Sequence, residues 1–270
     1  MNITGETTLV GLIGDPVSHS LSPRMQNAAF AARGLDWAYV PLRVDGSRLE
    51  GAVAGLIALE FAGANVTIPH KTAVLAFCDE LDDVAARAGS VNTLVVSNGR
   101  VLASSTDGPA VVGLVDADGV SVLVLGAGGG AQAVATSLLD AGARSLTVAA
   151  RDEERAHALI ARLKTLFPER ELAADDAWPP AAAATMVVNA TPIRDEAVVS
   201  LDGVEQVVDL AYNADGSPTA LAAAAREAGC ERVVDGADVL LGQGAASFER
   251  WTGVAAPVEV MRAAVRSLPA

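Results

Sequence analysis

The segment VLVLGAGGGAQAV, Val122–Val134, joins a short apolar run to an alanine-rich stretch through a glycine-rich turn. Glycines permit such a tight turn, and they let backbone N–H groups at a helix N-terminus come close to a pyrophosphate. The spacing Gly126-x-Gly128-x-x-Ala131 fits the usual dinucleotide pattern. An ordinary tight turn between a strand and a helix is the alternative. Because a strand, a helix and a second strand surround the turn in the expected order, we favour a nucleotide site.

Apolar runs with the length of strands alternate with helical stretches on both sides of this turn. The runs that follow it are typical of buried parallel strands: SLTVAAR at 145–151, TMVVNAT at 185–191 and QVVDLAY at 206–212, with a helix over Glu153–Phe167. The runs that precede it predict strands over 8–14, 37–44 and 64–69.

Two short motifs in the first part of the chain predict a helix and a hairpin. A helix is predicted over Ser22–Arg33, with Ser22 as the N-cap, Pro23 at the first helical position and Gly34 after the end. The dipeptide Asn98-Gly99 lies between two strand-like runs, so it predicts a β-hairpin.

The alternation of strands and helices predicts an α/β protein with two domains. Residues 1–110 are expected to form an N-terminal α/β domain. Residues 111–236 are expected to form a Rossmann-type domain with a doubly wound parallel sheet that binds the cofactor. Residues 237–270 are helical by pattern and are expected to complete the first domain.

Composition excludes several classes of partner. The chain has 270 residues, of which 51% are hydrophobic, yet its apolar runs stop well short of a membrane span. Met1–Asp15 lacks the features of a secretory signal, so a cytoplasmic protein is expected. With 19 basic and 33 acidic residues the formal charge is −14, which disfavours nucleic acid and anionic membranes as partners. Cys78 and Cys230 have no metal-ligand spacing and are expected to be buried thiols.

The end of the second strand of the Rossmann-type unit bears on the choice of cofactor. An NAD site usually has an acidic residue there to bind the ribose hydroxyls. In this chain Arg151 occupies the tip, and Arg155 follows one helical turn later. Two guanidinium groups suit a 2′-phosphate, so the sequence favours NADP. Two readings oppose this: pairing of the arginines with Asp152 and Glu154, and binding of an NAD ribose by Asp152.

Polar residues follow several apolar runs in the first domain, where open α/β sheets hold their ligands. Hydroxyls, amides, one amine and one carboxylate are the groups that would bind a small polyhydroxy acid. Each of them taken singly has a structural explanation, such as a helix cap, a turn residue or solvated surface. Their joint occurrence in four loops favours a substrate site. They are Ser20 and Ser22, then Asn65, Thr67 and Lys71, then Asn92, and finally Thr106 and Asp107.

With these residues in view, the chain resembles the shikimate dehydrogenase family over nearly its whole length. The matching motifs occur in the family's order. They are SHSLSP, ANVTIPHK, AGSVNT, STDG, GAGGGAQA, VVNAT, DLAY and GQGAASFERWTG.

The resemblance implies a role for each matched residue. Lys71 and Asp107 would form the catalytic pair, and Ser20 and Ser22 would bind the substrate carboxylate. Further contacts to the ring hydroxyls, or support of the site, would come from Asn65, Thr67, Asn92, Tyr212 and Gln243. The cofactor would be bound by the glycine-rich turn, by the two arginines after the second strand of the Rossmann-type unit, and by three later segments. These cofactor residues are Gly126, Ala127, Gly128, Gly129, Gly130, Ala131, Arg151, Arg155, Asn189, Thr191, Leu210 and Gly236.

The implied activity is the reversible reduction of 3-dehydroshikimate to shikimate with NADPH, on the pathway to aromatic amino acids. As hydride reaches the ring ketone, negative charge grows on its oxygen, and an ammonium group within hydrogen-bond reach stabilises that charge and delivers a proton. The resemblance therefore assigns proton transfer to Lys71, with Asp107 as the group that orients it.

The chain departs from the family pattern at four places. Ser105 stands where the family usually has Asn, and Pro109-Ala110 where a glycine is common. Asp152 occupies the position of a usual phosphate ligand. The loop within 189–200 lacks a glycine that the family usually has. This loop is expected beside the nicotinamide, and the difference concerns its conformation.

Other residues are expected to be structural. His19 and His70 adjoin predicted site residues, but Lys71 and Asp107 already fill the acid–base roles, so packing or hydrogen bonding is expected for both histidines. Trp251 is expected in the core. The three histidines have no carboxylate at ligand spacing, so no metal is expected.

Rival functions remain open at this point. The nearest is a quinate or dual quinate/shikimate dehydrogenase that uses NAD; serine at both Ser20 and Ser22 favours shikimate. A second is a catalytically inactive sensor of a dinucleotide or metabolite, which ought to have lost Lys71 or Asp107. A third is a dehydrogenase for a methylene-bearing cofactor, which gives no reason for the paired serines. The oligomeric state is expected to be a monomer or a homodimer.

Overall fold

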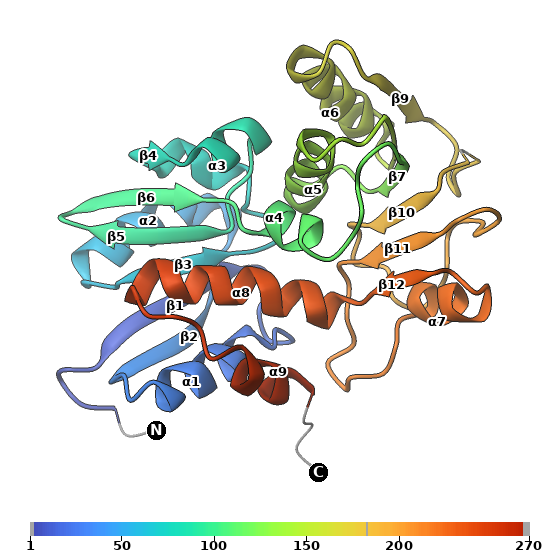
Figure 1. Cartoon of the computed structure of the whole chain (residues 1–270). Coiled ribbons are helices and arrows are strands. Elements are labelled where there is room, and N and C mark those ends of the chain that lie inside the picture. The colour runs from blue at the N-terminus through green and yellow to red at the C-terminus, as the bar shows by residue number, and fades with distance from the viewer. Residues whose placement is uncertain (1–2, 182, 267–270) are drawn as a thin grey trace. The chain divides into compact units, whose positions relative to one another are not determined.

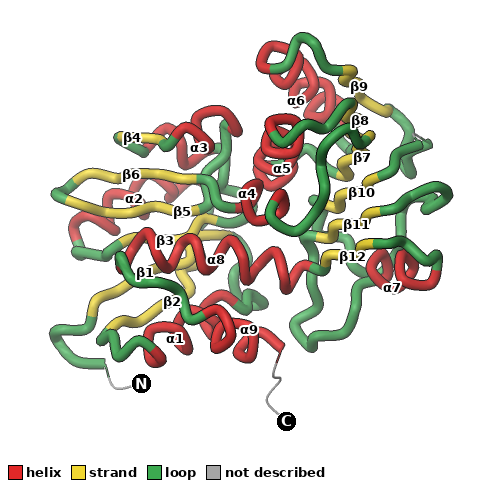
Figure 2. The backbone as a smooth tube through the Cα atoms, in the orientation of Figure 1, coloured by secondary structure: helices red, strands yellow, loops and turns green. Residues whose placement is uncertain are grey.

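The computed structural model describes residues 3–181 and 183–266 and divides the chain into two compact units. Unit 1 comprises Met1–Thr106 and Leu240–Ala270, and unit 2 comprises Asp107–Val239. Figure 1 labels the elements of both, and Figure 2 separates helices from strands by colour. Both units are built from sheets and helices, so the predicted α/β class is confirmed.

Unit 1 holds a mixed sheet with strand order β2-β1-β3-β5-β6-β4. Strand β1 pairs in parallel with β2 and β3, whereas β5 runs antiparallel to both β3 and β6. The strands are β1 (Thr8–Gly14), β2 (Trp37–Arg43), β3 (Gly63–Val66), β4 (Glu80–Leu81), β5 (Thr93–Ser97) and β6 (Arg100–Ser104). The helices before the last strand are α1 (Ser22–Ala32), η1 (Gly46–Arg48), α2 (Leu49–Ala58), η2 (Ala73–Phe77) and α3 (Asp83–Ala88).

Several boundaries in unit 1 differ from the sequence prediction by one to three residues. Helix α1 has Leu21 at its N-cap, and Ser22 is the first helical residue, so the prediction of Ser22 as the cap is wrong. The backbone N–H of Ser22 donates to Ser20 Oγ, 3.2 Å away. The N-cap position is occupied by Leu21, the residue before Ser22. Strand β3 ends at Val66 rather than at Pro69, although Thr67 N still donates to Ile13 O of β1 at 2.8 Å.

The hairpin prediction is confirmed. Asn98 and Gly99 connect β5 to β6 with φ values of 52° and 72°, the pair of positive angles that a two-residue turn of type I′ requires. The hairpin brings the start of β5 and the end of β6 to one edge of the sheet, where Thr93 pairs with Ser104.

Unit 2 holds an all-parallel sheet with strand order β12-β11-β10-β7-β8-β9, the order of a doubly wound dinucleotide-binding fold. The pattern did not predict β9 or β12. The strands are β7 (Ser121–Leu125), β8 (Ser145–Ala149), β9 (Glu171–Asp175), β10 (Met186–Asn189), β11 (Gln206–Asp209) and β12 (Arg232–Val234). The helices are α4 (Asp107–Val112), α5 (Gly129–Asp140), α6 (Glu153–Leu166) and α7 (Ala220–Glu227).

The core of unit 2 lies between this sheet and its helices. Side chains that point from β7 and β8, such as Val124 and Val148, are fully buried against Leu138 of α5 and Leu163 of α6. This packing fixes the carboxyl ends of the strands, and the loops that leave those ends carry the predicted cofactor residues.

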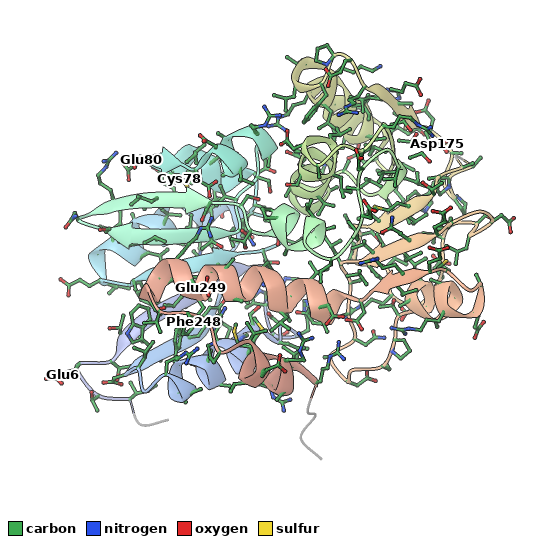
Figure 3. The ribbon with its side chains drawn as sticks, in the orientation of Figure 1. Glu6, Cys78, Glu80, Asp175, Phe248 and Glu249 are labelled. Carbon is green, nitrogen blue, oxygen red and sulfur yellow. The ribbon has the colours of Figure 1, made fainter. Side chains whose placement is uncertain are left out.

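The C-terminal segment from Leu240 belongs to unit 1. It holds most of α8 (Gly236–Thr252) and all of α9 (Val258–Arg266); residues 267–268 of the predicted helical range lie outside the described residues. Phe248 of α8, labelled in Figure 3, packs on Phe30 of α1 with ring centroids 5.4 Å apart. Trp251 is 8% exposed and donates from Nε1 to Leu94 O, so its predicted place in the core is confirmed. Among the described helices, none is long and apolar enough to cross a membrane.

Candidate active site

Six predicted site residues of unit 1 lie at or just beyond one edge of its sheet. Strands β1 and β3 end there, and because β5 is antiparallel its first residue lies there as well. A seventh residue, Gln243, comes from α8. The residues at the edge are Ser20 and Ser22 after β1, Asn65 within β3, Thr67 and Lys71 after β3, and Asn92 just before β5.

Asn92 joins three segments through its side-chain amide. Its Nδ2 donates to Thr106 Oγ1 at 2.8 Å and to Gln243 Oε1 at 3.1 Å. Its Oδ1 accepts from the backbone N–H of Thr106 at 2.8 Å. Thr106 Oγ1 also donates to Gln243 O at 3.1 Å. The start of β5, the end of β6 and α8 are therefore locked together, and the next residue of the chain is Asp107.

Asn65 is almost completely enclosed and its side chain is engaged on both sides. Its Oδ1 accepts from the hydroxyl of Tyr39 at 2.8 Å. Its Nδ2 donates to Asn92 O at 2.9 Å and lies 3.0 Å from Ser247 Oγ and 3.2 Å from Thr93 Oγ1. A side chain that already has protein partners for its oxygen and nitrogen supports the site rather than offering new contacts to a ligand.

The loops that carry the hydroxyls and the amine are tied to the sheet by backbone bonds. Thr67 N donates to Ile13 O at 2.8 Å, and Val91 N donates to Lys71 O at 2.8 Å. Thr67 and Lys71 are half-buried, and Ser22 is buried at 6% exposure. Asp107 is the first residue of α4 and is also 6% exposed.

Lysine is scarce in this chain. Of its 19 basic residues only Lys71 and Lys164 are lysines, and the other 17 are arginines. Lys164 lies in the last turn of α6, where a cation opposes the helix dipole. An arginine stays protonated and cannot exchange a proton, whereas a lysine can. The lysine at position 71 can therefore exchange a proton, which an arginine at the same position could not.

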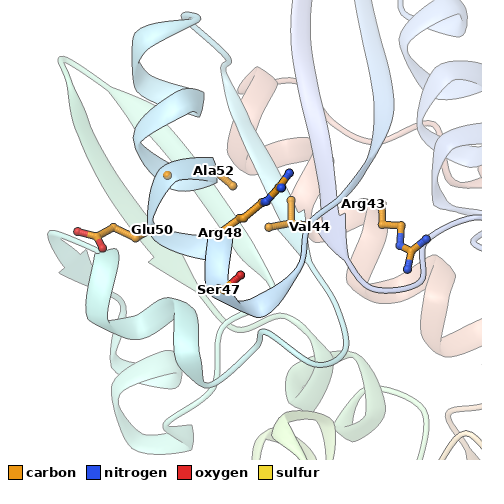
Figure 4. Close-up of a pocket in the computed structure, with 7 residues that line it drawn as sticks. Arg43, Val44, Ser47, Arg48, Glu50 and Ala52 are labelled. Atoms are coloured by element: carbon orange, nitrogen blue, oxygen red, sulfur yellow. The ribbon is translucent and has the colours of Figure 1, made fainter.

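A hollow of about 740 Å³ lies in unit 1, and none of the predicted site residues is among those that line it (Figure 4). It is lined by Arg43, Val44, Ser47, Arg48, Glu50, Gly51 and Ala52. The guanidinium of Arg43 pairs with Asp15 at 2.7 Å. The carbonyl of Val44 lies 2.7 Å from Nε2 of the buried His70, so the predicted hydrogen-bonding role of that histidine is confirmed.

In unit 2 the glycine-rich turn connects β7 to α5. Gly126 has φ = +103°, a conformation that side chains rarely allow, and its N–H donates to Ala149 O of the neighbouring strand. A Cβ added at Gly128 would meet nothing within 4 Å, so the turn leaves open space beside the helix N-terminus. Within the described residues no side chain caps α5 and its first turn carries no acid. Such a terminus suits a pyrophosphate, and the residues present therefore fit a dinucleotide.

The tip of β8 carries the two predicted arginines, both exposed. Asp152 caps α6: its Oδ1 accepts from Arg155 N at 3.1 Å, and its Oδ2 pairs with Arg155 Nε at 3.0 Å. The pairing of Arg155 with Asp152 that the sequence left open therefore occurs. Because Oδ1 is engaged by the helix cap and Oδ2 by the Arg155 guanidinium, Asp152 is poorly placed to bind ribose hydroxyls as an NAD site would need.

The remaining predicted residues of unit 2 follow the ends of its other strands. Asn189 ends β10, Leu210 follows β11, and Gly236 follows β12. Thr191 donates through N and Oγ1 to Asn189 Oδ1, at 3.0 and 2.6 Å. Tyr212 is half-buried, and its carbonyl lies 3.4 Å from Arg194 Nη1.

Two buried groups have shifted pKa values. Burial raises the pKa of Asp209, opposed by hydrogen bonds from Thr219, Ala211 and Asn189 and assisted by the negative charge of Asp235. Burial and Asp79 raise the pKa of the Cys78 thiol to about 11, so this thiol is unreactive at neutral pH. Both cysteines are half-buried rather than fully buried as predicted. Among the described residues no group of three or more His, Cys, Asp or Glu side chains could hold a metal ion.

Several residues that complete these networks were missed by sequence reasoning. Tyr39 and Ser247 contact Asn65 from β2 and α8, at positions that read only as strand and helix core. Asp209 gave a signal, since an acid that ends a buried strand is unusual. Asp209 belongs to the matched motif DLAY, but no role was predicted for this residue from the sequence.

Three family models match the chain. The family described as "Shikimate dehydrogenase substrate binding domain" matches residues 12–94. "Shikimate / quinate 5-dehydrogenase" matches residues 110–211, and "Shikimate 5'-dehydrogenase C-terminal domain" matches residues 236–266.

Similar proteins agree along the full length. An NADP(+) shikimate dehydrogenase of Methanopyrus kandleri is 41% identical, covering 98% of this chain and 97% of its own. A crystal structure of a shikimate dehydrogenase in complex with NADP+ has a TM-score of 0.85 at 32% identity, covering 98% of this chain and 96% of that one. The ligand-free 5-ketofructose reductase of Gluconobacter sp. strain CHM43 has a TM-score of 0.83 at 28% identity, with coverage of 97% and 99%.

Proposed function

The chain belongs to the shikimate dehydrogenase family, and on that premise we propose that it reversibly reduces 3-dehydroshikimate to shikimate with NADPH. Unit 1 holds the substrate and unit 2 holds the cofactor. The observation that carries the proposal is the hydrogen-bonded assembly of Asn92, Thr106 and Gln243, at the sheet edge from which the loop to Lys71 leaves.

The substrate is an anion with ring hydroxyls. Ser20 and Ser22 supply two adjacent hydroxyl donors for its carboxylate. Thr67 supplies a hydroxyl that contacts the ring hydroxyls, and the amides of Asn92 and Gln243, which are hydrogen-bonded to each other, hold the site. Asn65 supports this set from behind through its bonds to Tyr39 and to the carbonyl of Asn92.

Backbone N–H groups and two arginine side chains bind the cofactor. Amides of the turn from Gly126 to Ala131 hold the pyrophosphate at the N-terminus of α5. Arg151 and Arg155 hold the 2′-phosphate. Asn189, Thr191 and Leu210, with Gly236 beside them, form the part of the site that receives the nicotinamide.

Proton transfer is the work of Lys71. The hydride comes from C4 of the nicotinamide of bound NADPH. Lys71 Nζ donates a hydrogen bond to the ketone oxygen of the substrate, stabilises its growing negative charge and gives up a proton to it. Asp107 orients the amine and accepts from the substrate. In the direction of oxidation the same amine takes the proton back.

Steady-state kinetics test this function. We expect kcat/KM for shikimate with NADP to exceed the values for shikimate with NAD, for quinate with either cofactor, and for 5-ketofructose. Shikimate carries a carboxylate for Ser20 and Ser22, whereas 5-ketofructose has none. A preference for NAD would contradict the roles of Arg151 and Arg155, and a preference for quinate would contradict the substrate assignment.

Activity with none of these substrates would contradict the enzyme assignment itself. Isothermal titration distinguishes that outcome further, because binding of NADPH and shikimate without turnover would identify a sensor. We expect both binding and turnover, since Lys71 and Asp107 are both present.

A further inference from the structure

Asp209 is a carboxylate with no exposure at the end of β11, and the proposed chemistry gives it no part. Its oxygens accept hydrogen bonds from three residues of unit 2. Oδ1 accepts from Asn189 Nδ2 at 2.8 Å and from Ala211 N at 2.9 Å. Oδ2 accepts from Thr219 Oγ1 at 2.5 Å. One side chain thus joins the ends of β10 and β11 to the first residue before α7.

These contacts continue into the loop after β10. Besides bonding to Asp209, Asn189 Nδ2 donates to Ile193 O at 3.1 Å. Its Oδ1 accepts twice from Thr191. The orientation of Asn189 is therefore fixed by Asp209, and the backbone from Thr191 to Ile193 is fixed by Asn189.

The same loops adjoin the glycine-rich turn. A Cβ built on Gly126 would lie 3.1 Å from Thr191 Cγ2 and 3.2 Å from Ala190 O. A Cβ built on Gly236 would lie 2.3 Å from Ala211 O. The segments that Asp209 anchors are thus in contact with the turn and with the start of α8, on the β10 and β11 side of β7.

The order of strands divides the dinucleotide between two sides. In a doubly wound sheet the pyrophosphate crosses the carboxyl edge at the central strand, here β7. Arg151 and Arg155 follow β8, on one side of β7, and belong to the adenosine half. The loops anchored by Asp209 lie on the other side of β7. We therefore assign the nicotinamide half of the dinucleotide to these loops.

We infer that Asp209 is a positioning residue for the nicotinamide half of NADP, acting through Asn189 and Ala211 without touching the cofactor. The inference rests on the proposed function. It predicts that the two halves of the cofactor respond differently to loss of the carboxylate. A general structural role would weaken both halves together or unfold the unit.

The test compares binding of NADPH with binding of 2′,5′-ADP, which carries the adenosine half and no nicotinamide. In Asp209→Asn one oxygen becomes an amide donor, so the acceptors for Asn189, Ala211 and Thr219 cannot all be kept. We expect the Kd of NADPH, measured by isothermal titration, to rise about tenfold or more, and the Kd of 2′,5′-ADP to stay within about twofold. Hydrogen exchange of the amides at 190–193 and 210–212 should quicken in the ligand-free variant.

Gln206→Leu is the matched control. Gln206 is the buried first residue of the same strand, and its side chain bonds Asp116 N and O at 3.0 and 2.8 Å. We expect both Kd values of this variant to match the wild type. If Asp209→Asn does not fold, Thr219→Val, which removes the donor to Oδ2 together with the acceptor that caps α7 at Ala222 N, should raise the Kd of NADPH selectively, and Thr219→Ser, which keeps both bonds, should restore it.

Equal loss of both ligands in Asp209→Asn or Thr219→Val would overturn the inference, as would unchanged NADPH binding in a folded Asp209→Asn. Wild-type protein that binds neither NADPH nor 2′,5′-ADP would overturn the proposed function and the inference together. Wild-type binding of both ligands with no selective loss in the variants would overturn the inference alone.

Discussion

At the scale of single residues, the arginines after β8 give a direct prediction on cofactor choice. We expect Arg151→Ala with Arg155→Ala to raise the KM for NADP by about a hundredfold or more, because charge-assisted hydrogen bonds contribute about 1.5–3 kcal/mol each and about 1.4 kcal/mol is a factor of ten. The KM for NAD should change little. Arg144→Ala, an exposed arginine before the other end of β8, is the control. Equal rises for both cofactors would show that the arginines act on something other than the 2′-phosphate.

Asp209 gives a prediction on stability against pH. Burial raises the pKa of this carboxyl above its ordinary value of 3.8, so between that value and its folded pKa the folded state binds more protons than the unfolded state. Its contribution to stability is therefore lost as the pH rises through that window. Asp209→Asn removes the titration. We expect the free energy of unfolding of the variant, relative to wild type, to increase from about pH 4 to pH 7 in urea titrations. A difference that falls with rising pH would contradict the shift.

At the scale of elements, the buried contacts of Asn65 link β2, β3, β5 and α8. Tyr39→Phe keeps the ring beside Trp251 but leaves Asn65 Oδ1 without its tyrosine donor. We expect a loss of about 1–2 kcal/mol in the free energy of unfolding and a severalfold higher KM for shikimate, with the KM for NADP unchanged. Ser97→Ala, at the exposed end of β5, should change neither quantity. A higher KM for NADP alone would contradict the supporting role of Asn65.

The elements also show what sequence reasoning can reach. The hairpin at Asn98-Gly99 and the turn at Gly126 were predictable because their backbone angles require those residue types. The short strands β9 and β12 were not, since each begins with an exposed charged residue and they are only five and three residues long. The N-cap of α1 was misplaced by one residue because serine is a frequent cap, whereas here Ser20 Oγ accepts from Ser22 N.

Side-chain partners were harder to predict than positions. Motifs gave the residues of both candidate sites, but the sequence could not reveal that Asn65 is satisfied by Tyr39 and Ser247, which come from distant parts of the chain. Nor could it decide whether Asp152 binds a ribose or caps α6, because both uses suit an acid at that place. Such choices depend on three-dimensional neighbours.

At the scale of the whole molecule, substrate binding is proposed for unit 1 and cofactor binding for unit 2. We expect shikimate alone to slow hydrogen exchange in unit 1, at 20–22, 65–71 and 91–93. We expect NADPH alone to slow exchange in unit 2, at 126–131, 151–155 and 189–193. Bound ligands stabilise the segments that contact them, so the patterns should separate. Protection of the glycine turn by shikimate, with none at 65–71, would contradict this division.

The most direct test of the central claim is the kinetics of Lys71 variants, because reduction of the ketone needs a proton as well as a hydride. We predict that Lys71→Ala and Lys71→Arg lower kcat about a hundredfold to ten-thousandfold, with the Kd of shikimate changed only modestly. Lys164→Arg, at the chain's other lysine, should keep full activity. If Lys71→Arg, which keeps the charge but cannot exchange a proton, retained kcat within about threefold, proton transfer by Lys71 would be contradicted.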